Sequence, residues 1–460
     1  MRGRGVKYAR GRSFAYVNLI RMDKRQTAKL IERDPASCEE PQKGFFRRLG
    51  PGLITGASDD DPSGIATYSQ AGATFGYGML WTALFSLPLM AAIQEISARL
   101  GRVTGRGIAS NIRRNYPAWV LYPIVFVLLV ANTINIGADI GAMGACLKLI
   151  VGGPSIVYCA LFAILIVVTQ IICPYRKFAD ILKWLTVVLF AYVVTAFFAH
   201  VDWKTALRAM VVPPIAWHDK TYISMLIAVL GTTISPYLFF WQAAMEREEI
   251  QSTPEDQPLK NDPKQARQQL ARIRIDTLVG MSASNIIAFF IMVTAAATIH
   301  PHQGAETINS AQQAAEALRP AAGRAAEVLF ALGIIGTGLL AVPVLAGSAA
   351  YGVGEALKWP TGIDRKAHKA KGFYGILAAS TLVGLAINIP ALHVNPIRAL
   401  VWAAVINGVA AVPVMIITML MFSRKSIMGP FTRTGHMLRV VGWIATGVMT
   451  VAAGLYLVGL

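Results

Sequence analysis

Charged residues are scarce in this chain of 460 residues, since Asp, Glu, Lys and Arg together make up only 15% of it. Soluble domains carry about 25% charged residues. Hydrophobic residues make up 55% of the sequence, and its mean hydropathy is +0.50. This composition argues against a soluble enzyme, a nucleic-acid-binding domain and a disordered chain, and it predicts a single body embedded in a membrane.

Cysteines and enzyme motifs are also few or missing. The four cysteines, Cys38, Cys146, Cys159 and Cys173, form no CxxC pair. We therefore expect reduced thiols rather than a disulfide framework or a zinc site. The sequence has no G-x-S-x-G motif and no P-loop, so we expect neither an enzyme nor a cofactor. The basic N-terminal stretch lacks an apolar core followed by a cleavage site and is predicted to be a cytoplasmic tail.

Apolar stretches long enough to cross a bilayer recur along the chain. A spanning helix needs about 20 mostly apolar residues. Eleven stretches meet this length: 52–70, 78–100, 118–148, 156–173, 182–201, 221–244, 275–299, 325–357, 373–389, 398–422 and 438–459. We therefore predict an all-α membrane protein with eleven transmembrane helices.

The basic residues predict how these helices are oriented. With the N-terminus inside, the inner segments hold 36 of the 43 Lys and Arg residues and the outer segments hold 7. Cytoplasmic loops carry an excess of Lys and Arg. The net charge of +18 is therefore explained by topology and requires no nucleic-acid partner. We expect a plasma-membrane protein of a bacterium, with the N-terminus in the cytoplasm and the C-terminus outside.

Eleven spans divide naturally into two repeats of five helices and one additional helix. Because five is odd, the second repeat enters the membrane from the opposite side, as in the inverted repeats of many secondary transporters. The predicted divisions are a basic tail at 1–48, a first repeat at 49–201, an outer loop at 202–220, a second repeat at 221–422 and the eleventh helix at 423–460.

The first span carries three consecutive aspartates, Asp59, Asp60 and Asp61, followed by Pro62. One charge at the bilayer centre costs about 2.5–3.5 kcal/mol on insertion scales. Pro62 and Gly64 disfavour helix, so we expect the span to unwind from Asp60 to Gly64. Freed backbone groups are tolerated in hydrocarbon only beside a cavity or an ion. The alternative is that this stretch is a loop outside the membrane and not a span. All later loops would then change sides, and the basic loops would no longer lie in the cytoplasm.

The sixth span has a similar interruption, with Ser235 and Pro236 near its middle. Pro236 is expected to leave the carbonyl of Thr232 without its usual donor. The alternative is an ordinary proline kink in which Ser and Thr bond to their own helix. The two interruptions open the two predicted repeats, where transporter sites are expected. Together they supply carboxylate, hydroxyl and carbonyl oxygens, which suit Mg²⁺, Ca²⁺ or Mn²⁺.

Several motifs resemble the Nramp divalent-metal transporters. These are Gly50-Pro51-Gly52-Leu53-Ile54, Asp61-Pro62-Ser63-Gly64, the run from Gln70 to Tyr77, and the run from Gln94 to Gly101. The resemblance covers about residues 45–460. It implies a LeuT-type fold, with helices one and six broken, and transport of transition metals coupled to protons.

The departures from the family pattern concern the metal ligands. Asp61 matches the family's aspartate, but Gly64 stands where the family has Asn. In the sixth helix Thr232 replaces an Ala whose carbonyl binds metal, Ser235 replaces Met, and Tyr237 replaces His. The lost thioether is the ligand that favours Mn²⁺, Fe²⁺ and Cd²⁺. The pattern is similar to the Nramp-related magnesium transporters, in which a larger site would let Mg²⁺ keep more of its water.

Proton coupling is expected to be weak. Tyr237 is a poor proton carrier near neutral pH. Asp139 in the third helix matches a family aspartate, but the acidic residue three positions later is Ala142. Asp139 is either a remaining proton relay or a buried aspartate paired with a hydroxyl or an amide, such as Asn132 or Asn135. Both interpretations remain open.

We therefore predict a uniporter-like carrier that brings hydrated Mg²⁺, or else Mn²⁺, into the cell by alternating access as a monomer in the lipid bilayer. Asp61 would neutralise the ion, and the predicted ligand set is Ser58, Asp61, Gly64, Thr232 and Ser235. Residues expected near this set, for coupling or around the ion's water shell, are Asp60, Asp139, Tyr237 and Asn407. For Asn407 a role in helix packing is the alternative.

Three alternatives stay open at this point. One is a proton-coupled Mn²⁺ or Fe²⁺ symporter of the ordinary Nramp type. Another is a carrier of a non-metal substrate on the same fold, with the aromatic run at 237–241 as a hydrophobic wall. A channel is the third.

Overall fold

The computed structural model describes residues 51–172, 188–214, 216, 218–252, 256–303, 308–432 and 435–459. Within these residues all regular structure is helical and no strand occurs, which confirms the all-α prediction. The predicted tail at 1–48 and part of the predicted fifth span lie outside the described residues.

Helices or helix pairs correspond to the predicted spans. They are α4 (Pro51–Asp59) with α5 (Pro62–Phe75), α6 (Trp81–Thr104), α8 (Ala118–Val151), α9 (Ser155–Ile172), α11 (Phe190–Phe198), α13 (Lys220–Thr233) with α14 (Pro236–Ser252), α15 (Ala266–Thr298), α19 (Ala326–Ala356), α20 (Lys371–Ala386), α21 (Pro396–Ser423) and α23 (His436–Val458). In the described part, seven helical segments are long and apolar enough to cross a membrane, or up to eight if one bent pair counts as a span. The number eleven therefore stays a prediction.

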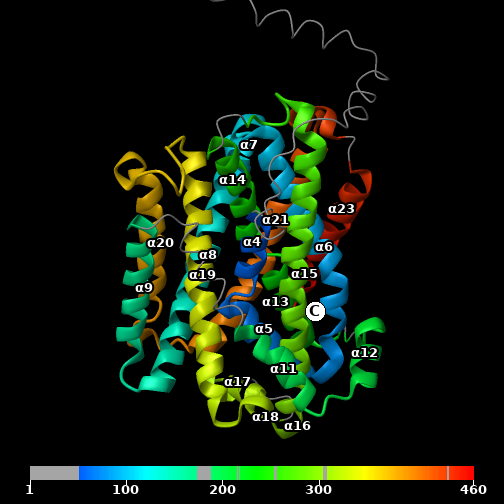
Figure 1. Ribbon diagram of the computed structural model, residues 1–460, viewed down its shortest axis with the longest axis vertical. Coiled ribbons are helices and arrows are strands. Elements are labelled where there is room, and N and C mark those ends of the chain that lie inside the picture. The colour runs from blue at the N-terminus through cyan, green and yellow to red at the C-terminus, as the bar shows by residue number, and fades with distance from the viewer. Residues whose placement is uncertain are drawn as a thin grey trace, which may run out of the picture.

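Short helices lie at the two ends of the bundle. Figure 1 shows α7 (Ile108–Asn115) at the top, and α12 (Trp203–Val211), α16 (His300–Gln303), α17 (Ala311–Ala315) and α18 (Arg319–Ala322) at the bottom. The sequence predicts α7 in a cytoplasmic segment and the other four in outer segments. Segments that are expected on the same side of the membrane thus lie at the same end of the molecule.

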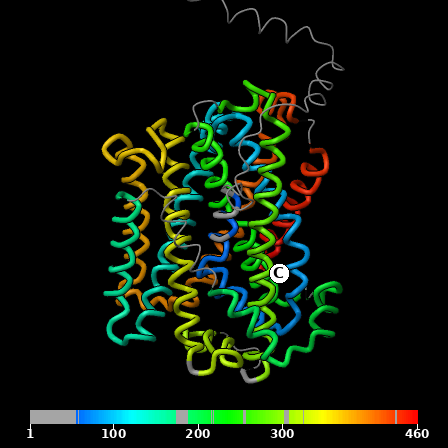
Figure 2. Tube along the Cα trace, in the orientation of Figure 1, coloured from blue at the N-terminus to red at the C-terminus, as the bar shows by residue number. Residues whose placement is uncertain are grey.

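The two broken helices lie at the centre of the bundle and run in opposite directions. Figure 1 shows α4 above α5 and α14 above α13, so the first pair descends where the second pair ascends. In Figure 2 the blue trace of the first pair is enclosed by helices from later in the chain. α15 packs on α4 and α5, and α21 packs on α13 and α5. This antiparallel arrangement is the one expected for inverted repeats. The repeat boundaries at 49–201 and 221–422 stay a prediction.

Glycines let the broken helices approach their neighbours closely. A Cβ at Gly56 of α4 would clash with the backbone of Gly280 in α15, and a Cβ at Gly231 of α13 would clash with the backbone of Ala404 and Gly408 in α21. Small residues at such crossings are typical of membrane helix packing. They place the backbones of both broken helices directly against continuous helices.

Helices on the outside of the bundle expose apolar side chains. On α9, Val157, Leu161 and Ile164 are each more than half exposed. A large exposed apolar face is unusual for a protein in water and normal for one in lipid. Cys146 and Cys159 are buried free thiols, in agreement with the sequence prediction; Cys38 and Cys173 lie outside the described residues.

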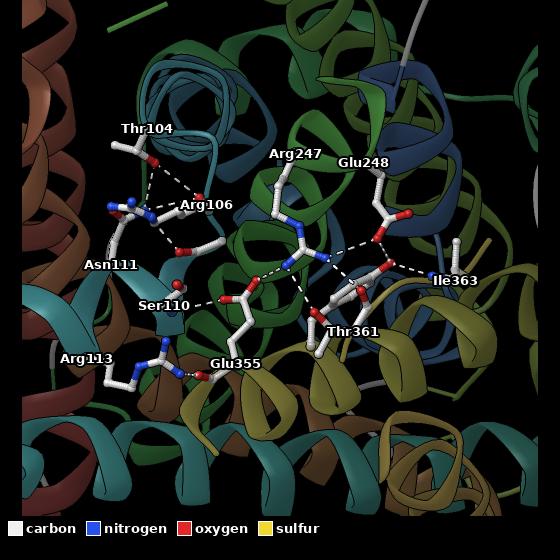
Figure 3. Close-up of polar contacts among 12 residues, drawn as sticks. Thr104, Arg106, Ser110, Asn111, Arg113, Arg247, Glu248, Glu355, Thr361 and Ile363 are labelled. Carbon is white, nitrogen blue, oxygen red and sulfur yellow. Dashed lines mark hydrogen bonds and ion pairs between the residues drawn. The ribbon is translucent and has the colours of Figure 1, made fainter. Parts of the chain in front are cut away.

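Charged residues gather at the end of the bundle that is predicted to face the cytoplasm. Glu95 and Arg99, which lie one turn apart on α6, form an ion pair. Arg247 of α14 pairs with Glu355 of α19 at 2.9 Å and with Glu248 at 3.1 Å (Figure 3). Glu355 also accepts a bond from the backbone N–H of Ser110 in α7 at 3.0 Å. This network joins three helices that are far apart in the sequence.

We predict that Arg247→Met markedly destabilises the protein, because it leaves Glu355 and Glu248 without their cationic partner in a mostly buried setting. Removing one partner of a buried pair costs about 3–5 kcal/mol. A thermal unfolding scan in detergent should show a clear fall in melting temperature. Arg319→Met is the matched control, because Arg319 and Glu316 form a loose pair at 3.8 Å with side chains 59% and 43% exposed. Equal melting temperatures for the two variants would contradict a structural role for the network.

Candidate functional site

The first helix break is short because Asp61 caps the second half-helix. Asp61 has extended backbone angles (φ −68°, ψ 168°), and Pro62 occupies the first helical position of α5, where proline is favoured. Asp61 Oδ1 accepts bonds from the backbone N–H of Gly64 at 2.7 Å and from the Ser63 hydroxyl at 2.8 Å. The prediction that the chain unwinds as far as Gly64 is therefore wrong, since this cap starts the helix two residues earlier.

The Asp61 carboxylate is buried, and among the described residues it accepts hydrogen bonds from uncharged donors only. The residue is 1% exposed. Its second oxygen, Oδ2, accepts a bond of 2.9 Å from Asn135 Nδ2 of α8. No ion pair among the described residues involves Asp61. A buried charge without an opposite charge is costly. A cation bound at this carboxylate would remove that cost.

The other two aspartates face a different helix. Ser284 Oγ of α15 lies 2.7 Å from Asp59 Oδ2 and 2.9 Å from Asp60 Oδ1. Both residues are buried. Asp60, which the sequence analysis places near the ion, is thus bound toward α15, whereas Asp61 is bound toward α8. The three consecutive carboxylates do not converge on one point.

The second break lies between Thr233, where α13 ends, and Pro236, where α14 begins. Ser235 Oγ lies 2.8 Å from the carbonyl oxygens of both Gly231 and Thr232. The prediction that Thr232 has a carbonyl without a donor is therefore wrong, because the Ser235 hydroxyl supplies one. The Ser235 oxygen, which donates its single hydrogen here, keeps its lone pairs.

The two breaks contact each other at two points. A Cβ at Gly64 would lie 3.0 Å from Thr232 Oγ1 and 3.4 Å from Asp61 Oδ1, so both oxygens border the position of Gly64 between α5 and α13. Thr232 Oγ1 is buried and has no hydrogen-bond partner among the described residues. At the second point, Tyr237 donates its hydroxyl to the carbonyl of Ser58 at 3.0 Å. The Ser58 carbonyl, a predicted ligand, thus already accepts a bond from α14.

Two further residues from the sequence prediction carry buried polar atoms without partners. Neither oxygen of Asp139 in α8 has a hydrogen-bond partner among the described residues. Asn132 donates instead to the carbonyl of Leu345 at 2.9 Å, and Asn135 donates to Asp61, so the predicted amide pairing of Asp139 is wrong. Asn407 of α21 is also fully buried, and neither end of its amide has a partner in the described part of the chain.

Sequence analysis missed the role of Asn135 as the partner of Asp61. In the sequence, Asn135 is visible as an amide side chain in an apolar span, one turn before Asp139. Because of that spacing, Asn135 was considered only as a partner of Asp139. The two residues that bond are 74 positions apart. Spacing along one helix cannot predict such a contact between helices.

The chemistry available between the two breaks is the Asp61 carboxylate together with neutral oxygens, because Asp59 and Asp60 contact Ser284 of α15. In the described parts of the chain, no group of three or more His, Cys, Asp or Glu side chains is placed to hold a metal ion. A cation bound here would meet Asp61 together with hydroxyl, carbonyl and amide oxygens. Such ligands suit hard cations that keep part of their water.

Comparison with known proteins supports this description of the fold. The model of the family "Natural resistance-associated macrophage protein-like" matches residues 52–459. The divalent metal cation transporter MntH of Klebsiella pneumoniae is 27% identical over 438 residues, which cover 92% of this chain and 97% of that protein.

Two solved structures show the same fold at low sequence identity. The manganese transporter of Eremococcus coleocola, in complex with an aromatic bis-isothiourea substituted compound, superposes with a TM-score of 0.71 at 15% identity, covering 91% of this chain and 88% of that one. MhsT in complex with L-phenylalanine gives a TM-score of 0.56 at 12% identity, covering 90% and 100%. The predicted LeuT-type fold is thereby confirmed.

Proposed function

This chain belongs to the Nramp family of divalent-metal transporters, and from this premise we propose that it carries hydrated Mg²⁺, and Mn²⁺ less readily, into the cell without obligatory protons. It is a multi-pass membrane transporter and not an enzyme. We place it in the bacterial plasma membrane as a monomer, with the N-terminus in the cytoplasm and the C-terminus outside. The observation that carries the proposal is the buried Asp61 carboxylate, which has neutral hydrogen-bond donors and no basic partner among the described residues.

The ligand chemistry supports a hard cation. Asp61 supplies the charge, and Thr232, Ser235 and the Ser58 carbonyl supply neutral oxygens directly or through water. No thioether stands at position 235 and no amide at position 64. Soft ligands are what favour Mn²⁺, Fe²⁺ and Cd²⁺ at such sites. Mg²⁺ gives up its water reluctantly and needs few direct protein ligands.

The burial of the site supports alternating access. Ser58, Asp61, Thr232 and Ser235 are each at most 2% exposed. An ion can reach them only if the half-helices move relative to the surrounding helices. The membrane potential then favours inward movement by about 2.3 kcal/mol per charge per 100 mV.

A proton-coupled symporter is the second candidate, because Asp139 offers a buried carboxylate without a hydrogen-bond partner on the helix that also contacts Asp61. A non-metal substrate has less support. Tyr237 is bonded to Ser58, and Trp241 packs against Tyr351 with ring centroids 6.2 Å apart. These aromatic rings are therefore engaged in the core rather than lining an open wall.

We expect Asp61→Asn to abolish Mg²⁺ uptake into proteoliposomes, with a loss of roughly a hundredfold or more, because it removes the charge of the carboxylate that is proposed to bind the ion without changing side-chain shape. Asp60→Asn is the matched control and should reduce uptake much less, since Asp60 faces Ser284. Melting temperature and elution profile should establish that both variants fold. Native uptake by a folded Asp61→Asn protein would reject Asp61 as a ligand.

We expect the residues at positions 235 and 64 to determine the selectivity between Mn²⁺ and Mg²⁺. Ser235→Met is expected to raise the ratio of Mn²⁺ to Mg²⁺ transport by about tenfold, since it adds a soft sulfur and expels water. Gly64→Asn in the same chain should enlarge the shift. Gly64→Ala is the control, because it brings a Cβ equally close to Thr232 without an amide. The test is competition between the two ions during uptake, and an unchanged ratio would count against this site geometry.

Internal pH distinguishes the two candidate mechanisms. Without proton coupling, Mg²⁺ uptake at zero pH gradient should proceed, respond to voltage and leave the pH inside the liposomes constant, because Tyr237 titrates far above neutral pH in water. The symporter predicts acidification in proportion to uptake, which Asp139→Asn would abolish. A dye that reports pH inside the vesicles measures either result.

A further inference from the structure

Asn135 occupies a special place beside the Asp61 carboxylate. An ionised carboxylate has about four lone-pair positions on its two oxygens. Oδ1 of Asp61 already accepts two bonds, from Gly64 and Ser63, whereas Oδ2 accepts one, from Asn135. The position still open to an ion is therefore on Oδ2. An ion bound there lies next to the Asn135 side chain.

The Asn135 amide has an unused oxygen at this point. Asn135 is fully buried, and its Oδ1 has no hydrogen-bond partner among the described residues. A buried polar atom without a partner is costly and rare. Amide oxygens of asparagine are ligands of hard divalent cations. In this chain the first break has no amide of its own at position 64, since that residue is glycine.

Asp139 could accept the amide hydrogen that would be released. It lies one turn after Asn135 on the same face of α8, and both of its oxygens lack a hydrogen-bond partner. A half-turn about the Cβ–Cγ bond, a soft torsion in asparagine, would exchange the two ends of the Asn135 amide. Oδ1 would then face the ion on Asp61, and Nδ2 would face Asp139. Asn135 Oδ1 would gain the ion as a partner, and the Asp139 carboxylate would gain a hydrogen-bond donor.

We propose that Asn135 is a specificity-determining residue that holds Asp61 through its N–H while the site is empty and turns its amide oxygen to the cation when the site is loaded. This inference rests on the proposed function, because it takes Asp61 as the residue that binds the ion. Asn135 of α8 would thus supply the amide oxygen that is missing from the first break, where position 64 is glycine. The ion would then be bound by oxygens from three helices, α5, α8 and α13.

The test compares Asn135→Leu with Asn132→Leu in proteoliposome uptake of Mg²⁺. Asn132 is an equally buried amide on the same helix, but it donates to the Leu345 carbonyl. For Asn135→Leu we expect KM to rise tenfold or more, since residues that orient a metal ligand contribute roughly 10–100-fold in affinity. The maximal rate should stay within about twofold of native, because the loss is in binding rather than in movement. Asn132→Leu should keep the native KM.

An infrared difference spectrum gives a readout that a packing role would not change. Adding Mg²⁺ to the native protein should shift one side-chain amide carbonyl band, because that oxygen becomes a ligand. The shift should persist in Asn132→Leu and vanish in Asn135→Leu. If Asn135→Leu does not fold, Asn135→Ser replaces it with the same expectations, because its hydroxyl is too short to reach the ion.

Two outcomes would overturn the inference: a native KM in a folded Asn135 variant, or an equal rise of KM in Asn132→Leu. The Asp61→Asn variant separates this failure from that of the proposed function. If Asp61→Asn loses uptake while Asn135→Leu keeps its KM, only the role of Asn135 is wrong. If Asp61→Asn retains uptake, the site itself is wrong.

Discussion

The arrangement at the centre of this protein depends on the buried Asp61 carboxylate, to which no basic residue in the described part of the chain is paired. Asp61 is held by a backbone N–H, a hydroxyl and an amide, all of them neutral. A buried ionisable group in a membrane-spanning segment commonly marks an ion pathway or a binding site. The broken helices, the surrounding hydroxyl and carbonyl oxygens, and the absence of a nearby lysine or arginine ion pair are all consistent with such a site.

The helix breaks form this site at little cost in backbone hydrogen bonding. Asp61 caps α5 with the same side chain that offers a lone pair to an ion, and Ser235 covers the carbonyls left free before Pro236. Each break is therefore only two residues long. Backbone groups that would otherwise be unsatisfied in hydrocarbon are bound within one turn. The breaks thus satisfy their own backbone groups and still have side-chain oxygens to offer an ion.

Much of this could be predicted from the sequence, because it depends on local composition. Runs of apolar residues predict the helices, and three aspartates beside Pro62 predict the first break. The choice of Asp61 among the three aspartates came from the resemblance to the Nramp family. The length of the break could not be predicted, since it depends on whether Asp61 turns back to cap its own helix. The bond between Asn135 and Asp61, which leaves Asp139 without this amide as a partner, could not be predicted either. Periodicity tells which residues share a face of α8, but not which other helix that face meets.

The close crossing of α4 and α15 has a consequence for motion. Gly56 lies directly against Gly280, and the Gly52 N–H bonds to Asp276 at 2.7 Å, so α4 is fastened to α15 along its length. The break at Asp60 and Asp61 meanwhile leaves α4 without a continuous helical link to α5. If α4 swung away alone, it would lose both contacts and expose a backbone that no side chain shields. Any movement of α4 that keeps these two contacts therefore has to carry α15 with it.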